Sequence, residues 1–185
     1  MTITVLIHPG LFNSGEGHWQ TLWEAGLPGA HRVQQRDWEQ PVRSEWVDTL
    51  DAAIRGAPGP VVLAAHSLGC ATAAWWAVTH GGAPHAAKLK GALLVAPPDV
   101  ERIDFPAFVT GFAPMPQVRL PFKTAVVASS DDPWCEQPRA KAWADAWGAH
   151  FYDLGLRGHI NAESGLGNWE QGRHWLNSLG PRFEG

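Results

Sequence analysis

The chain has 185 residues, with 14 Lys and Arg against 18 Asp and Glu, and therefore a formal net charge of −4. This length suits a single domain, 1–185, with a substantial core, and it is too short for a (β/α)₈ barrel of about 250 residues. Hydrophobic residues make up 45% and charged residues 17% of the chain, which excludes a disordered protein. Aromatic usage is unusual, since eleven Trp accompany a single Tyr.

The charge and hydropathy patterns exclude several kinds of partner. No Lys/Arg cluster offers the basic stripe that nucleic acids require. Residues 1–8 lack the pattern of a signal peptide, and no stretch reaches the roughly 18 apolar residues that span a bilayer. Two cysteines, Cys70 and Cys135, make no disulfide framework. We expect a cytoplasmic protein without membrane or nucleic-acid partners that acts on a small molecule as a monomer or a small homo-oligomer.

Short apolar runs alternate with helical patterns along the chain. Strands are predicted at 3–7, 30–36, 60–65, 91–95, 123–128 and 149–154, and all but the second are nearly continuously apolar, as strands buried on both faces are. Helices are predicted at 19–23, 44–54, 71–80, 138–148 and 170–179, with Ser44 as a cap, Gly148 as a stop and Gly180-Pro181 closing the last one. This alternation predicts an α/β fold of three layers, in which helices cover both faces of a parallel sheet of about six strands.

Residues 97–121 interrupt the alternation, because six prolines fall within this stretch. It is predicted to be an irregular excursion that is too short to form a large cap domain.

The third predicted strand ends in Ala65-His66-Ser67-Leu68-Gly69 and leads directly into a helix. A nucleophilic serine on such a sharp strand–turn–helix connection needs small residues two positions before and after it, and Ala65 and Gly69 meet this need. Ala65 departs mildly from the usual glycine. Ser67 is therefore the candidate nucleophile, and His66 beside it is expected to be structural.

Serine needs a base that is oriented by a third group, and in this fold the acid and then the histidine follow later strands. Asp131 and Asp132 follow the fifth predicted strand, and Gly158-His159 follows the sixth. We predict His159 as the base and Asp132 as the acid, because Asp132 directly precedes Pro133. Asp131 stays open as the alternative.

A serine hydrolase also needs two N–H donors for the oxyanion. The amide of Leu68 follows the nucleophile and is predicted as one donor. The loop after the first strand, His8-Pro9-Gly10-Leu11-Phe12, is predicted to supply the second from Leu11, with Phe12 as the next choice.

The sequence also resembles a known family. The Pro-Gly loop with His18-Trp19, the Asp37-Trp38 segment with Pro41 and Trp46, and the three motifs around Ser67, Asp132 and His159-x-Asn161 are similar to small serine hydrolases of the retinoblastoma-binding-protein-nine and YdeN-like type. The resemblance runs from Ile3 to about Leu179. It implies an α/β-hydrolase fold without a large cap, a six-stranded parallel sheet and the roles given above for Ser67, Asp132 and His159.

The predicted function is cleavage of a small ester or acyl amide through an acyl-enzyme, without metal or cofactor. The histidines show no ligand spacing such as H-E-x-x-H, so no metal site is expected. Candidate pocket residues are apolar: Leu11, Phe12, Trp38, Phe105, Phe112, Met115, Trp134 and Ile160. The alternative function is a non-catalytic binding protein of the same fold with a vestigial triad. Most tryptophans lie on predicted helices and are expected to pack on the sheet.

Overall fold

The structure is a computed structural model that describes residues 3–180. Its centre is a six-stranded sheet made of β1 (Thr4–His8), β2 (Ala30–Arg32), β3 (Val61–His66), β4 (Leu89–Val95), β5 (Lys123–Ala128) and β6 (His150–Asp153). The strands pair in the order β2-β1-β3-β4-β5-β6, and every pair is parallel. All carboxyl ends therefore meet at one edge, where ligand sites of open α/β sheets form.

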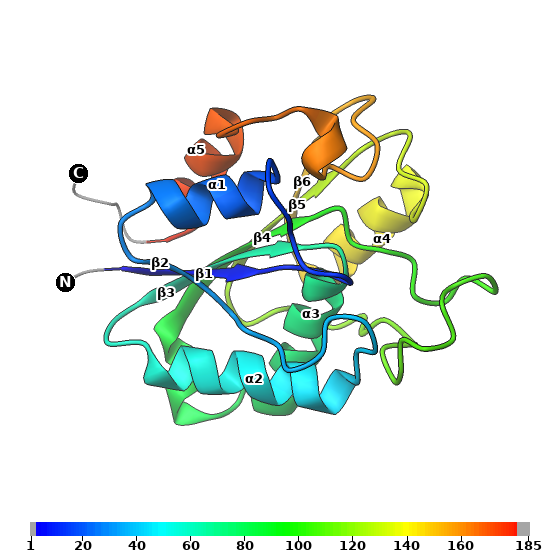
Figure 1. Cartoon of the computed structure of the whole chain (residues 1–185). Coiled ribbons are helices and arrows are strands. Elements are labelled where there is room, and N and C mark those ends of the chain that lie inside the picture. Colours follow the sequence, from blue (N-terminus) through cyan, green and yellow to red (C-terminus); the bar gives the residue numbers. More distant parts are fainter. Residues whose placement is uncertain (1–2, 181–185) are drawn as a thin grey trace.

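Helices cover both faces of this sheet, as predicted (Figure 1). On one face lie α1 (Trp19–Gly26) and α5 (Glu170–Leu179). On the other lie α2 (Arg43–Gly56), α3 (Leu68–His80) and α4 (Gln137–Trp147). A short 3₁₀ helix, η1 (Pro84–Lys88), precedes β4, and a second, η2 (Ala162–Ser164), follows β6. Residues 97–121 contain no strand or helix and add no cap domain.

The tryptophans fill the two layers between helices and sheet. Trp46, Trp76, Trp143 and Trp147 lie in the core under α2, α3 and α4, each at most 1% exposed. Trp19 and Trp23 lie in the core under α1 and α5 and contact each other with ring centroids 4.6 Å apart. Large aromatic side chains bury much area each, so this usage gives a small domain its core.

Some predicted boundaries were wrong for identifiable reasons. The second strand ends at Arg32 and not at residue 36, since it pairs only with β1 at the sheet edge. Ser44 does not cap α2, because the helix begins one residue earlier at Arg43. The helix after Ser67 begins at Leu68, as expected for the residue that follows the nucleophile turn, three residues before the Ala- and Trp-rich run 71–80 that identified the helix in the sequence. Gly148 ends α4 in the left-handed conformation as predicted, with φ +70°. Pro181 lies outside the described residues.

Candidate active site

The sheet topology brings the loops after β1, β3, β5 and β6 together. His8 at the end of β1 pairs in register with Ala65 of β3, so the Gly10 loop and the Ser67 turn lie side by side. The loops after β5 and β6 carry Asp132 and His159 to the same edge. Residues distant in sequence thus meet because parallel strands end at one edge.

Ser67 occupies a strained turn between β3 and α3. Its backbone adopts φ 53° and ψ −123°, a conformation that costs a residue with a side chain on the order of 1–3 kcal/mol. Its amide donates to the Val95 carbonyl oxygen at 2.9 Å, which ties the turn to β4. Phe12, Asn13 and Ile160 near the same edge also have positive φ. Strained backbone conformations therefore occur in the loops after β1, β3 and β6, at the carboxyl edge of the sheet.

Ser67, His159 and Asp132 form a continuous hydrogen-bonded array. The Ser67 Oγ and His159 Nε2 are 2.8 Å apart. The other ring nitrogen, Nδ1, lies 2.9 Å from both carboxylate oxygens of Asp132. Because a carboxylate accepts, the proton of the neutral ring sits on Nδ1 and leaves Nε2 free to accept the serine proton. The Asp132 side chain is only 3% exposed, which shields this pair from solvent.

The two adjacent aspartates have different partners. Asp132 contacts the His159 ring and accepts the Trp134 amide at 2.9 Å. Asp131 accepts the Ser129 hydroxyl at 2.6 Å and the Gly158 amide at 2.8 Å. These two hydrogen bonds, the hydroxyl first, hold the pKa of Asp131 below its usual value. The geometry therefore places Asp132, and not Asp131, beside the imidazole.

Two further side chains hold the backbone of the His159 loop. His66 Nε2 donates to the His159 carbonyl oxygen at 2.8 Å, and the Trp19 indole Nε1 donates to the Ile160 carbonyl oxygen at 3.0 Å. The His66 and His159 rings lie 4.9 Å apart. His66, which directly precedes Ser67 in the chain, thus holds the loop that carries His159. Sequence reasoning gave His66 a structural role and missed this contact, because nothing local marks it.

The backbone of residues 8–12, called the cradle below, lies against the Ser67 turn. The Phe12 amide donates to the Trp38 carbonyl oxygen at 2.9 Å, so it is already engaged. Within residues 3–180, neither the Leu11 amide nor the Leu68 amide at the start of α3 donates a hydrogen bond to a protein acceptor. The free donors are therefore the two predicted first, and a helix N-terminus favours negative charge at Leu68.

Two glycines allow the β1 loop to approach the turn this closely. A Cβ on Gly10 would lie 2.7 Å from the Ser67 Cβ, and a Cβ on Gly69 would lie 2.5 Å from the His8 carbonyl oxygen. Both distances are too short for any side chain. The glycines are required by close contact between the two loops, since neither has a positive φ.

Three buried imidazoles near the site are held neutral. Burial lowers the pKa of His8 to about 4, and burial with the nearby Arg32 and His159 lowers that of His18 to about 4. Burial, followed by the nearby His159 and His18 rings, lowers the pKa of His66 well below its usual value. All three rings are therefore uncharged at neutral pH.

A cavity of about 220 Å³ opens over Ser67 and His159. Its walls include Leu11, Phe12, Phe105 and Trp134, as predicted, together with Asn13, His18, Pro98, Pro106 and Asn161, which the sequence did not indicate. Four predicted pocket residues do not line it. Phe112 and Ile160 are buried in the two cores, at 1% and 0% exposure, and Trp38 packs edge-on against Trp46. Met115 is likewise in the core, because the proline-rich segment folds back onto α3 and α4.

Gln20 of α1 is a second residue that the sequence did not single out. It is fully buried and donates through Nε2 to the carbonyl oxygens of His8 and Ala64, at 3.1 and 2.9 Å. His8 is the last residue of β1, and Ala64 lies two residues before the end of β3. Gln20 therefore joins the strand that leads into the Gly10 loop to the strand that leads into Ser67.

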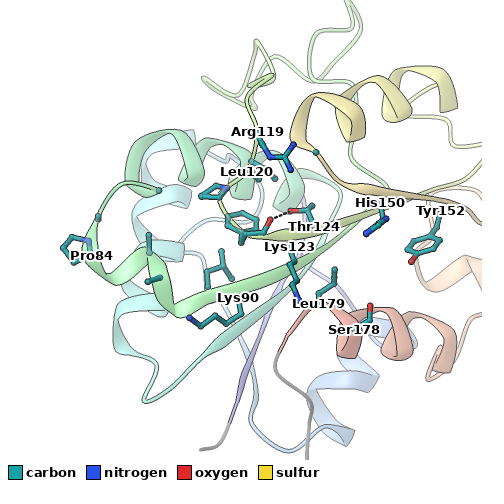
Figure 2. Close-up of a pocket in the computed structure, with 18 residues that line it drawn as sticks. Pro84, Lys90, Arg119, Leu120, Lys123, Thr124, His150, Tyr152, Ser178 and Leu179 are labelled. Carbon is teal, nitrogen blue, oxygen red and sulfur yellow. Dashed lines mark hydrogen bonds between the residues drawn. The ribbon is translucent and has the colours of Figure 1, made fainter.

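A larger groove, of about 1230 Å³, lies at the opposite edge of the sheet. Figure 2 shows it around Lys90, Lys123, Arg119 and His150, near the amino ends of β4, β5 and β6. Since the strands are parallel, this groove is remote from Ser67 and holds no part of the serine array. Size alone therefore does not identify the site.

Comparisons with known proteins agree with this architecture. A YdeN-like hydrolase from Pectobacterium atrosepticum is 32% identical over 96% of this chain and 90% of its own, with a TM-score of 0.82. The ydeN gene product of Bacillus subtilis is 24% identical over 96% and 98%, with a TM-score of 0.73. The type II thioesterase BorB of the borrelidin cluster shares the fold at 18% identity over 97% and 91%, with a TM-score of 0.61. No curated protein matches the sequence.

The described residues contain no helix long and apolar enough to cross a membrane. Residues 5–178 match the sequence profile of the family described as Serine hydrolase, which is nearly the whole chain. Together with the six-stranded parallel sheet and the YdeN-like neighbours, this match shows that the chain belongs to the serine hydrolase family of the α/β-hydrolase superfamily.

Proposed function

We propose that this protein hydrolyses a small, uncharged ester or acyl amide through an acyl-enzyme formed on Ser67. The observation that carries the proposal is the unbroken array from Ser67 Oγ through His159 to Asp132, with contacts of 2.8 and 2.9 Å. Those are the distances at which proton transfer between a nucleophile and its base takes place.

In the first half of the proposed reaction, Ser67 Oγ bonds to the substrate carbonyl carbon while its proton passes to His159 Nε2. The carbonyl π electrons move to oxygen, and the Leu11 and Leu68 amides donate to that oxyanion. Asp132 stabilises the imidazolium and holds its orientation. The tetrahedral intermediate then breaks its bond to the leaving group, which takes the proton from His159.

Water completes the cycle. It attacks the acyl carbon and gives a proton to His159, and the second intermediate collapses to release the acid and return the proton to Ser67. Each oxyanion donor contributes about 3 kcal/mol to barrier lowering in enzymes of this kind. No cofactor takes part in these steps.

The cavity supports a substrate that is small and neutral. Its volume of about 220 Å³ falls below the roughly 300–1,000 Å³ of drug-sized sites. None of the residues that line it within 3–180 is Lys, Arg, Asp or Glu. Its lining includes the apolar side chains of Phe12, Phe105 and Trp134.

The lining also includes two side-chain amides, those of Asn13 and Asn161. The Asn13 side-chain oxygen accepts from the Ser14 amide and the Arg32 guanidinium, and that of Asn161 accepts from the Glu163 amide. Within residues 3–180 neither NH₂ group donates to a protein acceptor, so both remain available to a substrate. We therefore expect the substrate to have a short acyl group that contacts the apolar side chains and an oxygen-bearing group that accepts from these amides.

A carboxylesterase assay with p-nitrophenyl esters of two to eight acyl carbons tests the proposal. We expect the highest kcat/KM for the short chains and a steep fall for the longest. Phe105→Ala removes part of the apolar wall and is expected to move the optimum to longer chains. Cleavage of peptide amides without turnover of any ester would overturn the substrate assignment.

A further inference from the structure

Three potential metal ligands meet in the helical layer over one face of the sheet, outside the cavity at Ser67. Asp51 lies in α2, His80 is the last residue of α3, and His85 lies in η1. One ligand atom from each lies within 4.8 Å of the other two. Their spacing in sequence matches no metal motif, so only the fold brings them together.

The His80 contact does not have the geometry of a hydrogen bond. Its Nδ1 lies 3.6 Å from the Asp51 Oδ1, which is too long for hydrogen bonding. Two ligands of one tetrahedral zinc ion are about 3.4 Å apart, given metal–ligand bonds of about 2.0–2.1 Å. His80 Nδ1 and Asp51 Oδ1 are therefore at nearly the separation that a shared metal ion imposes.

His85 approaches the same oxygen. Its Nε2 donates to Asp51 Oδ1 at 2.6 Å. For this nitrogen to bind a metal, its proton has to move to Nδ1 or leave to solvent, after which the nitrogen lone pair and the carboxylate face the ion together. Binding of a metal therefore competes with this hydrogen bond.

Neighbouring groups hold the three side chains in place. Trp76 Nε1 donates to Asp51 Oδ1 at 3.0 Å, and Arg55 Nε lies 2.8 Å from Asp51 Oδ2. The outer nitrogen of His80 lies 3.8 Å from a carboxylate oxygen of Asp48. At 3.8 Å this contact is not a hydrogen bond, but Asp48 lies near the position from which a carboxylate commonly orients a metal-binding histidine.

Burial and charge suit a divalent ion that enters from solvent. The Asp51 side chain is 6% exposed, whereas those of His80 and His85 are 28% and 23% exposed. The Asp51 carboxylate already accepts hydrogen bonds from Trp76 and His85. Two imidazoles and one carboxylate, with a fourth position open to water, form a donor set that zinc prefers.

We infer that Asp51, His80 and His85 form a zinc-class divalent metal site that braces α2, α3 and η1, independent of the serine array. The bound ion takes His80 Nδ1, His85 Nε2 and Asp51 Oδ1, with water as the fourth ligand. Its role is to stabilise the helical layer, since it lies outside the cavity over Ser67.

The test is a zinc titration of the full chain after chelator treatment, read by competition with a chromophoric indicator. We expect one equivalent of zinc to bind and to raise the melting temperature. His80→Gln and His85→Gln are each expected to weaken binding at least tenfold and to abolish the zinc-dependent shift. The exposed His174 gives the matched control, and His174→Gln is expected to bind zinc as the native chain does.

A second control separates this site from the imidazoles around Ser67. His159→Gln is expected to keep the full zinc affinity. Circular dichroism without zinc shows whether each variant is folded, and a variant that is not folded is replaced by the Asn change at the same position. The inference is overturned if zinc produces no stabilisation, if binding survives both His80→Gln and His85→Gln, or if His159→Gln abolishes it.

Discussion

Gly10→Ala gives a direct test of the cradle that faces Ser67. The added Cβ would lie 2.7 Å from the Ser67 Cβ, 3.0 Å from the His66 carbonyl oxygen and 3.1 Å from the Leu68 nitrogen. Ordinary contacts begin near 3.4 Å, so the loop must withdraw by about 0.7 Å. Gly10 does not have a positive φ, and the perturbation is therefore a steric one.

The expected cost follows from the position of the Leu11 amide, which moves with this loop. Oxyanion donors act over about 2.7–3.1 Å, and a shift of 0.7 Å removes most of one such bond. We expect kcat/KM for a short p-nitrophenyl ester to fall by about 10²–10³, equivalent to about 2.7–4 kcal/mol, with KM changed little. Overpacking costs about 1–3 kcal/mol of stability, which a typical domain survives.

Gly15 provides the control, because it lies in the same loop and a Cβ there would meet no atom within 4 Å. Gly15→Ala is expected to keep kcat/KM within about twofold of the native value, and unfolding curves of both variants check that they are folded. Native activity in Gly10→Ala, or an equal loss in Gly15→Ala, would refute the role given to the cradle.

Three further predictions concern the base, its loop and the buried imidazoles. Asp132→Asn is expected to lower kcat by about 10⁴. Asp131→Asn keeps an acceptor oxygen for the Gly158 amide and is expected to lower kcat far less. Equal losses of kcat in the two variants would contradict the assignment of Asp132 as the acid. His66→Phe keeps a ring but loses the donor to the His159 carbonyl oxygen. Steady-state kinetics is expected to show kcat reduced by about 10–100-fold at constant KM. An unchanged kcat would contradict the positioning role of His66. His18 has a pKa of about 4 in the folded protein and about 6.5 in the unfolded chain. Between pH 6.5 and pH 4 the unfolded chain therefore binds more protons than the folded protein, so the free energy of unfolding falls as the pH drops through this range. His18→Asn retains a cap acceptor for α1, and denaturant titrations are expected to show a shallower pH slope in that window; an unchanged slope would contradict the neutral buried ring.

The fold could be predicted from the sequence because its information is local. Apolar runs that are buried on both faces identify five of the six strands, and the parallel order follows from the helices between them. The second strand was overextended because β2 lies at the sheet edge and pairs with β1 alone, so burial constrains its composition less.

The serine, histidine and cradle loop could also be located, since each requires small residues at a fixed place in the chain. The choice between Asp131 and Asp132 depended on where each side chain points, and only the hydrogen bonds to Gly158 and to His159 separate the two. The pocket predictions failed at Phe112 and Ile160 for a different reason. A hydrophobic residue is expected to be buried, but its hydrophobicity does not show whether it lies in the core or lines a cavity.

Long-range polar contacts were beyond the reach of sequence patterns. Trp19 and Gln20 look like the apolar and polar faces of one helix, yet they hold the Ile160 carbonyl and the ends of two strands. Asp51, His80 and His85 are separated by the whole of β3 and α3 and by the turn after them. In each case, tertiary packing determines the partner, and no periodic pattern in the sequence indicates it.

The measurement that tests the central claim most directly is covalent labelling of the intact chain by a fluorophosphonate probe, read by mass spectrometry. The probe phosphonylates a serine only where a base takes its proton and an oxyanion is stabilised. We predict one adduct per chain on Ser67, none on Ser67→Ala, and greatly slowed labelling of His159→Gln. A folded native chain that is not labelled, or that is labelled equally after Ser67→Ala, would contradict the assignment of Ser67 as the nucleophile.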